Sequence, residues 1–127
     1  MQILPFYASL LALMFVALSL RTIRMRRRKK VAVGDGGNLE MLRAMRVHSN
    51  FAEYVPISLI LLYFVEQQSA NPILIHALCL CLLIGRIIHA IGVRKVREDF
   101  RYRVLGMSMT FTVIIVSAIY ILLSYAW

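Results

Sequence analysis

Acidic residues are scarce in this sequence, and its longest apolar runs carry almost no charge. The 127 residues include 6 Asp and Glu against 15 Lys and Arg, a formal net charge of +9, yet 61% of them are hydrophobic. Nucleic-acid-binding domains carry similar charge without such an apolar average, so this balance excludes an ordinary soluble basic domain. It predicts a small integral membrane protein with no nucleic-acid partner.

Cysteine and histidine are too few and too scattered to indicate a disulfide framework or a metal site. Cys79 and Cys81 are two positions apart, which places them on opposite faces of a helix, so we expect them to fill apolar space without pairing. The histidines, His48, His76 and His89, fall on different spans or at different depths. The sequence therefore predicts no metal ligands, and His48 is expected to be an interfacial or packing residue.

Apolar stretches define the fold. The first, residues 3–20, contains no charge, which disfavours a proton-coupled exporter, because that class needs an ionisable carboxylate buried there. The other spans are expected at about residues 42–65, 72–93 and 104–126. The chain is thus predicted to be an all-α membrane protein, a single domain over residues 1–127 built as a bundle of four transmembrane helices.

Basic residues are concentrated in two segments. Residues 21–30 and 94–103 hold 12 of the 15 Lys and Arg, whereas the link at residues 66–71 has none. Because basic loops stay on the cytoplasmic side, both segments are predicted to be cytoplasmic loops, with both termini in the periplasm. Orientation and contact with lipid headgroups explain their charge.

The segment VAVGDGGN, residues 31–38, is the most glycine-rich part of the chain. It lacks the Lys-Ser/Thr pair and the preceding strand of a phosphate-binding loop, so it is predicted to be a turn that leads into a helix. Asn38 or Gly37 is expected to cap that helix.

Polar side chains gather on one face of the second span. At about 100° per residue, this face holds Arg43, Arg46, Asn50, Glu53 and Tyr54. One interpretation is a helix seam in which either arginine neutralises Glu53 and Asn50 hydrogen-bonds a neighbouring helix. We favour a polar site open to the cytoplasm, because charges at membrane depth are costly and commonly line a substrate path. Guanidinium, amide and carboxylate groups suit a zwitterionic, anionic, peptide-like ligand.

The third and fourth spans carry further basic residues. Arg86 and His89 are three positions apart and face the same way, so they are expected to form a second basic wall of the site, unless Arg86 extends to the membrane surface. The fourth helix is expected to begin at Arg103. One face of it then runs through Met107, Thr110, Ile114 and Ser117.

A family resemblance rests on two segments, LRAMRVHSNFAEYVP at residues 42–56 and RIIHAIG at residues 86–92. Together with four spans in a chain of this length, they resemble the MAPEG family, the membrane-associated proteins of eicosanoid and glutathione metabolism. The similarity is greatest to small bacterial members, in which a basic first loop, a GDGGN-like turn and an RAxRxHxNFxEYxP helix follow in the same order. An inner membrane location is therefore expected.

The resemblance implies a homotrimer that holds glutathione between neighbouring subunits near the cytoplasmic face. Carried over position by position, it assigns glutathione binding to Arg46, Asn50, Glu53, Tyr54, Arg86 and His89. It assigns stabilisation of the glutathione thiolate to Arg103, with Arg101 as the alternative. Val93 stands where glutathione-using members often carry a tyrosine, so the implied site has one hydroxyl fewer.

Two functions follow from this resemblance. The first is a glutathione-dependent transferase or peroxidase that attacks a lipophilic small molecule, an electrophile or hydroperoxide arriving from the bilayer. The second is a non-catalytic member that binds a ligand or acts as a scaffold. Family membership alone does not decide between them.

Overall fold

The computed structural model describes residues 2–93 and 99–126, and within these ranges it contains four helices and no strand. They are α1 (Leu4–Lys29), α2 (Leu39–Gln67), α3 (Pro72–Val93) and α4 (Phe100–Ala126). The predicted all-α fold is confirmed. Helices α1, α3 and α4 are long and apolar enough to cross a membrane, whereas α2 is long enough, at 29 residues, but charged in its first half.

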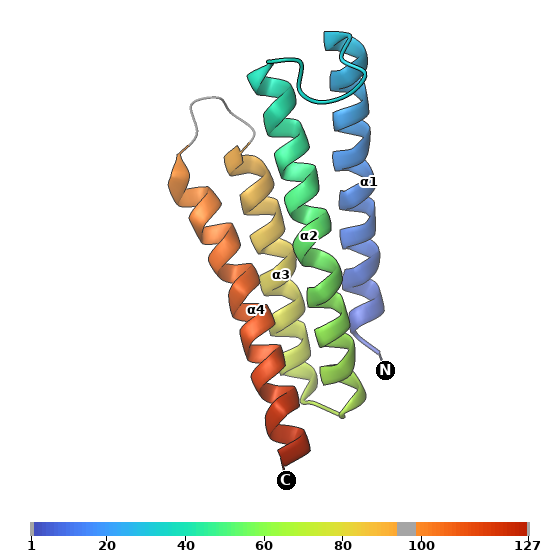
Figure 1. The fold of residues 1–127 in the computed structure, drawn as a ribbon. Coiled ribbons are helices and arrows are strands. Elements are labelled where there is room, and N and C mark those ends of the chain that lie inside the picture. The colour runs from blue at the N-terminus through green and yellow to red at the C-terminus, as the bar shows by residue number, and fades with distance from the viewer. Residues whose placement is uncertain (1, 94–98, 127) are drawn as a thin grey trace.

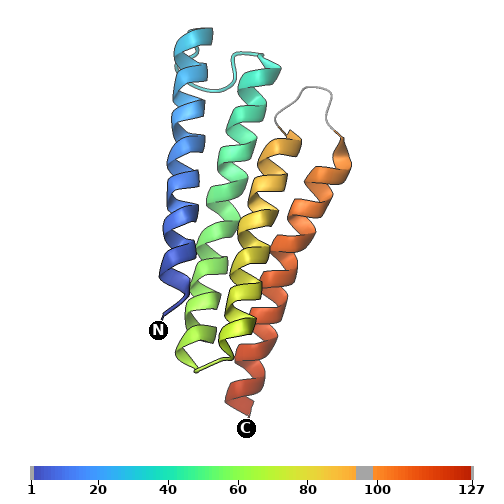
Figure 2. The same ribbon diagram turned by 180° about the vertical axis from the view of Figure 1, so that it is seen from behind.

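The helices run alternately up and down, with α2 and α3 in the middle (Figure 1). Within the described ranges α1 packs against α2 and α3, α4 also packs against α2 and α3, and α1 does not contact α4. The start of α1 and the end of α4 lie at one end of the bundle, and the α1–α2 connection lies at the other (Figures 1 and 2). This arrangement places the end of α1 and the start of α4, the described parts of the two predicted cytoplasmic segments, at a common end.

Helix α1 continues well beyond the predicted span. Residues 21–29 were expected in a loop but form its last turns. Arg and Lys are good helix formers, and their charges complement the negative end of the helix dipole. The helix ends at Lys30, whose left-handed backbone (φ 55°) directs its N–H to the carbonyls of Arg26 and Arg27. The expectation of a loop from residue 21 is therefore wrong.

Helix α4 also begins earlier than expected, at Phe100 instead of Arg103. The Asp99 carboxylate accepts the backbone N–H of Arg101 at 3.0 Å and so caps the first turn. Arg101 and Arg103 consequently both lie in the first turn of α4. Residues 94–98, the rest of the second basic segment, lie outside the described residues.

The glycine-rich segment is a turn, as predicted, and Asn38 caps α2. Its side-chain oxygen accepts the N–H of Met41 at 3.0 Å. Asp35 supports the turn by accepting the N–H of Gly37 at 2.9 Å. A side chain on Gly36 would meet Val31 Cγ2 at 2.7 Å in a left-handed backbone conformation, so this position requires glycine.

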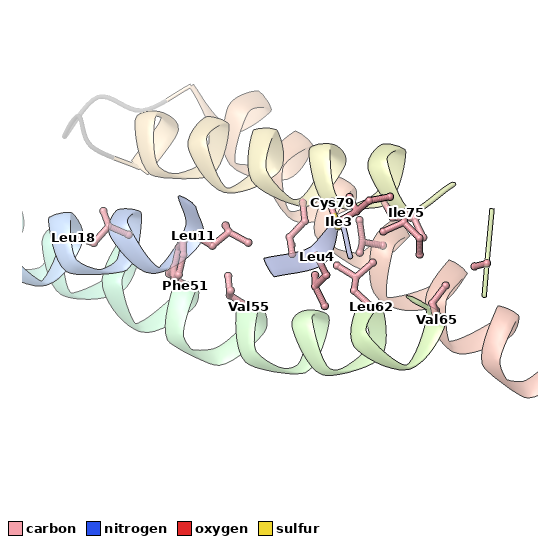
Figure 3. Close-up of a cluster of buried hydrophobic side chains, with 14 of the residues drawn as sticks. Ile3, Leu4, Leu11, Leu18, Phe51, Val55, Leu62, Val65, Ile75 and Cys79 are labelled. Atoms are coloured by element: carbon pink, nitrogen blue, oxygen red, sulfur yellow. The ribbon is translucent and has the colours of Figure 1, made fainter. Parts of the chain in front are cut away.

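The apolar core lies mainly between α1, α2 and α3 (Figure 3), and Val113 of α4 also belongs to it. Its larger buried side chains include Leu11, Leu18, Phe51, Val55, Leu62 and Ile75. The Glu66 carboxylate at the end of α2 accepts the N–H groups of Ile3 (2.5 Å) and Leu4 (3.0 Å), which fixes the start of α1 against α2.

Helices α3 and α4 approach closely at two glycines. A Cβ on Gly106 would lie 2.6 Å from the Gly85 carbonyl oxygen and 2.8 Å from the backbone nitrogen of His89. A Cβ on Gly85 would lie 2.9 Å from Met109 Cβ. Small residues at such crossings allow helices to pack backbone to backbone in membranes. This contact sets the position of α4, and hence of Arg103, relative to α3.

Candidate functional site

One face of the first half of α2 forms a wall of a cavity. Leu39, Leu42, Arg43 and Arg46 follow the i, i+3, i+4, i+7 spacing of a helix face, and Asn50 continues it one turn further. Arg46 is exposed, and Arg43 and Asn50 are half-buried. The favoured prediction, a polar face on α2 that opens into a site, thus has a cavity to match it.

The cavity has a volume of about 300 Å³ and lies at the end of the bundle where α2 begins and α3 ends. His89 and Val93 of α3 and Arg103 of α4 complete its lining. The Nη1 atom of Arg43 donates to the Val93 carbonyl at 3.4 Å, which links the α2 wall to the end of α3. Three guanidinium groups, an amide and an imidazole therefore surround one space.

Arg86 lies beneath this cavity instead of extending to the membrane surface. Only 1% of the side chain is exposed. Its Nη1 donates to Asn50 Oδ1 at 2.8 Å, and its Nη2 donates to the Gly106 carbonyl at 3.2 Å. Arg86 thus connects α2, α3 and α4. The alternative of an arginine reaching the surface is wrong, because its partners lie inside the bundle.

The contact with Arg86 fixes the orientation of the Asn50 amide. Arginine has only donors, so the Asn50 group that faces it is the oxygen. Asn50 itself lines the cavity, and with its oxygen held by Arg86 its NH₂ group is left to donate to a ligand. Arg86 therefore acts on the cavity through Asn50.

Glu53 and Tyr54 do not line the cavity, although the sequence places them on the same helix face. Glu53 is exposed and forms no ion pair with a residue in the described ranges, so the part of the predicted seam in which an arginine neutralises it is not observed. The other part is observed, because Asn50 accepts a hydrogen bond from Arg86 of the neighbouring α3. Tyr54 is half-buried, and its ring packs edge-on against Phe111 of α4, with 5.5 Å between ring centroids. Both lie beyond Asn50 along α2, outside the cavity of a single chain.

The structure separates the two arginines proposed near the thiol. Both residues are exposed, but Arg103 lines the cavity and Arg101, two residues earlier on α4, does not. The face of α4 that runs through Met107, Thr110, Ile114 and Ser117 is turned inward at two of these positions, because Thr110 and Ser117 are fully buried. The geometry therefore favours Arg103 over Arg101 as the residue of α4 that meets a ligand.

His48 faces α1, away from the cavity, as expected. Its Nε2 atom lies 3.0 Å from the Ser19 hydroxyl, and its ring stacks on Phe15 at a centroid distance of 4.9 Å. It packs between helices and does not approach the polar face of α2.

Sequence reasoning missed the apolar part of the lining. Leu39 and Leu42 share the arginine face at helical spacing, but apolar residues on a helix face do not by themselves indicate a site. Val93, where the resemblance implies only a missing hydroxyl, lines the cavity and contributes its carbonyl to Arg43. The cavity is therefore amphipathic, with a basic side and an aliphatic side.

This arrangement suits an anionic ligand that also carries apolar groups. Guanidinium groups bind carboxylates in bidentate geometry, and the Asn50 amide is a donor of fixed direction. No acidic residue lines the cavity in the described part of the chain, so its lining favours negative charge.

Comparison with known proteins supports the family resemblance. The MAPEG family profile matches residues 4–123. The inner membrane protein YecN of Escherichia coli strain K12 is 39% identical over 104 residues, which cover 82% of this chain and 78% of YecN. YecN of Escherichia coli O6:H1 matches with the same identity and coverage. With apolar helices of membrane-spanning length, this chain is an integral inner membrane protein, and it belongs to the MAPEG family.

Proposed function

We propose that this protein is a membrane-bound glutathione-dependent transferase or peroxidase. The observation that carries the proposal is the meeting of Arg46, Asn50 and Arg103 at one cavity at the end of the bundle. Glutathione has two carboxylates, amide groups and a thiol, so it matches a basic cavity with one directed amide donor. Family membership is consistent with this substrate class.

Different residues of the cavity bind different groups of glutathione. Arg46 and Arg43 pair with the carboxylates of the peptide, and the Asn50 NH₂ group donates to one of its carbonyls. His89, which is 4% exposed, closes the base of the cavity. Arg86 is a positioning residue, because it holds Asn50 without lining the cavity itself.

Arg103 stabilises the thiolate. A free thiol with a pKa near 8.5 is only a few per cent ionised at neutral pH, and an adjacent guanidinium shifts that equilibrium toward the nucleophile. As a transferase, the thiolate forms a carbon–sulfur bond while the leaving group departs with its electron pair. As a peroxidase, two glutathione molecules reduce a hydroperoxide to the alcohol and water and become one disulfide.

Glu53 and Tyr54 join the site through assembly. Glu53 is exposed on α2, where it can meet the ammonium group of a peptide held between two copies of the chain. We therefore propose the homotrimer implied by the resemblance, with the site completed at the subunit contact. The basic segments face the cytoplasm, where glutathione is supplied, and the lipophilic substrate enters from the bilayer.

A non-catalytic, ligand-binding role is the second candidate, and Val93 favours it. This residue lines the cavity with no hydroxyl group, at the position where glutathione-using members of the family often carry a tyrosine. Binding without turnover is the expected behaviour of such a member.

Titration calorimetry of detergent-purified protein with glutathione tests the proposal. Wild type should bind saturably, and Arg46→Gln should bind at least about tenfold more weakly because a carboxylate loses its partner. Arg27→Gln, an exposed change on α1, is the control and should bind as wild type does.

An activity assay then separates the two candidates. Glutathione consumption with an aryl halide or an organic hydroperoxide supports the enzyme, and saturable binding without turnover of either supports the non-catalytic role. Equal affinity of Arg46→Gln and wild type would overturn the assignment of the cavity.

A further inference from the structure

A second hollow lies on another side of the bundle, between α1 and α3. We call it the basic groove. Arg21, Arg24 and Arg28 of α1 line it, and Ala90 and Ile91 of α3 form its facing wall. Its volume is about 540 Å³, and it shares no lining residue with the cavity described above.

The arginines of the groove follow a helix face and are not spread around α1. Their spacing of three and four residues places them in one row, and Ala17 and Leu18 extend that row into the apolar part of the helix. The other basic residues of segment 21–30 do not line the basic groove. Arg26, Arg27 and Lys30 border a separate shallow hollow beside Val31 and Ala32.

Several neighbouring basic groups already have protein partners. Lys29 Nζ lies 2.9 Å from Glu40 Oε2, and this ammonium holds the pKa of Glu40 below its ordinary value. Arg26 donates to the Gly34 carbonyl at 2.9 Å. Arg24 and Arg28 are exposed and donate no hydrogen bond to a residue of the described ranges, although the charge of Arg28 also lowers the pKa of Glu40. These two guanidinium groups are available to an external anion.

The depth of the groove matches the boundary of a bilayer. The uncharged part of α1 ends at Leu20, and Arg21 follows directly. From Arg21 to Arg28 the helix rises roughly 10 Å, on the scale of the polar layer on one side of a membrane. Leu18 and Ile91 then lie at the depth of the hydrocarbon, with Ile91 62% exposed.

We propose that the basic groove is a binding site for an acidic phospholipid. The phosphate pairs with Arg24 and Arg28, and an acyl chain lies along the apolar wall formed by Ala17, Leu18 and Ile91. Guanidinium groups suit phosphate, and basic pockets between membrane helices bind acidic headgroups. The apolar residues that continue the row favour a lipid over a free phosphate ion, because a phosphate ion has no apolar part that could contact them.

The test is native mass spectrometry of delipidated protein in neutral detergent, titrated with phosphatidylglycerol or phosphatidylcholine. Wild type should bind phosphatidylglycerol saturably and in clear preference to phosphatidylcholine. The double variant Arg24→Gln/Arg28→Gln should lose that preference, with binding weakened roughly tenfold or more. The matched double variant Arg27→Gln/Lys30→Gln removes the same charge from another face of the same turns and should stay within about twofold of wild type.

A change in the apolar wall gives an independent measurement. Ala17→Phe fills the groove without altering its charge, and it should weaken phosphatidylglycerol binding while thermal unfolding stays as in wild type. Glutathione binding by Arg24→Gln/Arg28→Gln should be unchanged, which separates this site from the cavity of the proposed function.

Four results would overturn the proposal. They are equal binding of the two lipids by wild type, equal losses in the two double variants, displacement of the lipid by millimolar inorganic phosphate, and a change of oligomeric mass in Arg24→Gln/Arg28→Gln. The third would indicate a site for free phosphate, and the fourth would indicate that a second copy of the chain occupies the groove.

Discussion

Arg86 is a guanidinium group buried inside a membrane protein with neutral partners in the described structure: the Asn50 side chain, the Gly106 carbonyl and the Met107 sulfur. Its Nε atom has no hydrogen-bond partner there. A buried charge without a counterion is costly, and apolar residues of similar size commonly replace such groups at no loss of stability. The arginine is therefore better explained by ligand binding than by folding.

This explanation predicts the behaviour of Arg86→Met. The variant should unfold at the same temperature as wild type or a few degrees higher, because the desolvated charge is gone. It should bind glutathione at least about tenfold more weakly, since Asn50 is no longer held. Thermal unfolding and calorimetry on the same preparation measure both. A large fall in unfolding temperature would instead make Arg86 a structural link between the helices.

Asn50→Asp tests the direction of the amide. The new carboxylate gives Arg86 a counterion, so stability should rise, while the cavity loses a donor and gains a negative charge. Glutathione affinity should fall by about tenfold or more. Ser49→Asp places the same charge one residue away and serves as the control, with a much smaller loss in calorimetry. Similar losses in both variants would show that overall charge, and not the Asn50 donor, determines binding.

At the scale of helices, the contact between α3 and α4 determines whether the cavity exists. Gly85 and Gly106 allow the two backbones to touch, which brings Arg103 to the same space as His89. Gly106→Ala should force the helices apart, because its Cβ would overlap the Gly85 oxygen and the His89 nitrogen, at a cost of about 1–3 kcal/mol.

Thermal unfolding checks this prediction. Ser108→Ala, an exposed change on the same helix, should leave the unfolding temperature within about a degree of wild type. If Gly106→Ala unfolds at the temperature of Ser108→Ala, the close approach of α3 and α4 does not limit stability.

Some features of the helices could be predicted from the sequence, and others could not. Apolar runs and the Asn38 cap are local features, so the existence of the four helices and the start of α2 could be predicted. The end of α1 and the start of α4 could not be predicted from hydropathy, because basic residues that mark a membrane boundary also extend helices past it. Helical spacing places Arg46 and Glu53 on related faces, but it does not say which neighbouring helix covers each position. That depends on packing between α2, α3 and α4.

At the scale of the whole molecule, orientation in the membrane can be tested directly. The positive-inside rule places residue 33 in the cytoplasm and residue 67 in the periplasm. Val33, in the α1–α2 connection, and Gln67, the last residue of α2, are both exposed. The α1–α2 connection and the end of α2 lie at opposite ends of the bundle (Figure 1), so the variants Val33→Cys and Gln67→Cys report on the two sides. A membrane-impermeant thiol reagent should label Gln67→Cys in intact bacterial cells and Val33→Cys only after permeabilisation. The reverse pattern would place the cavity on the periplasmic side, away from cytoplasmic glutathione.

We propose that the cavity holds glutathione with its thiol beside Arg103. Ultraviolet difference absorbance in the thiolate band, recorded while glutathione is titrated at neutral pH, tests this arrangement most directly. Wild type should show a saturable band, Arg103→Gln should lose it, and Arg101→Gln, the same change two residues away and outside the cavity lining, should keep it. No band in wild type at saturating glutathione, or equal loss in the two variants, would contradict the role of Arg103.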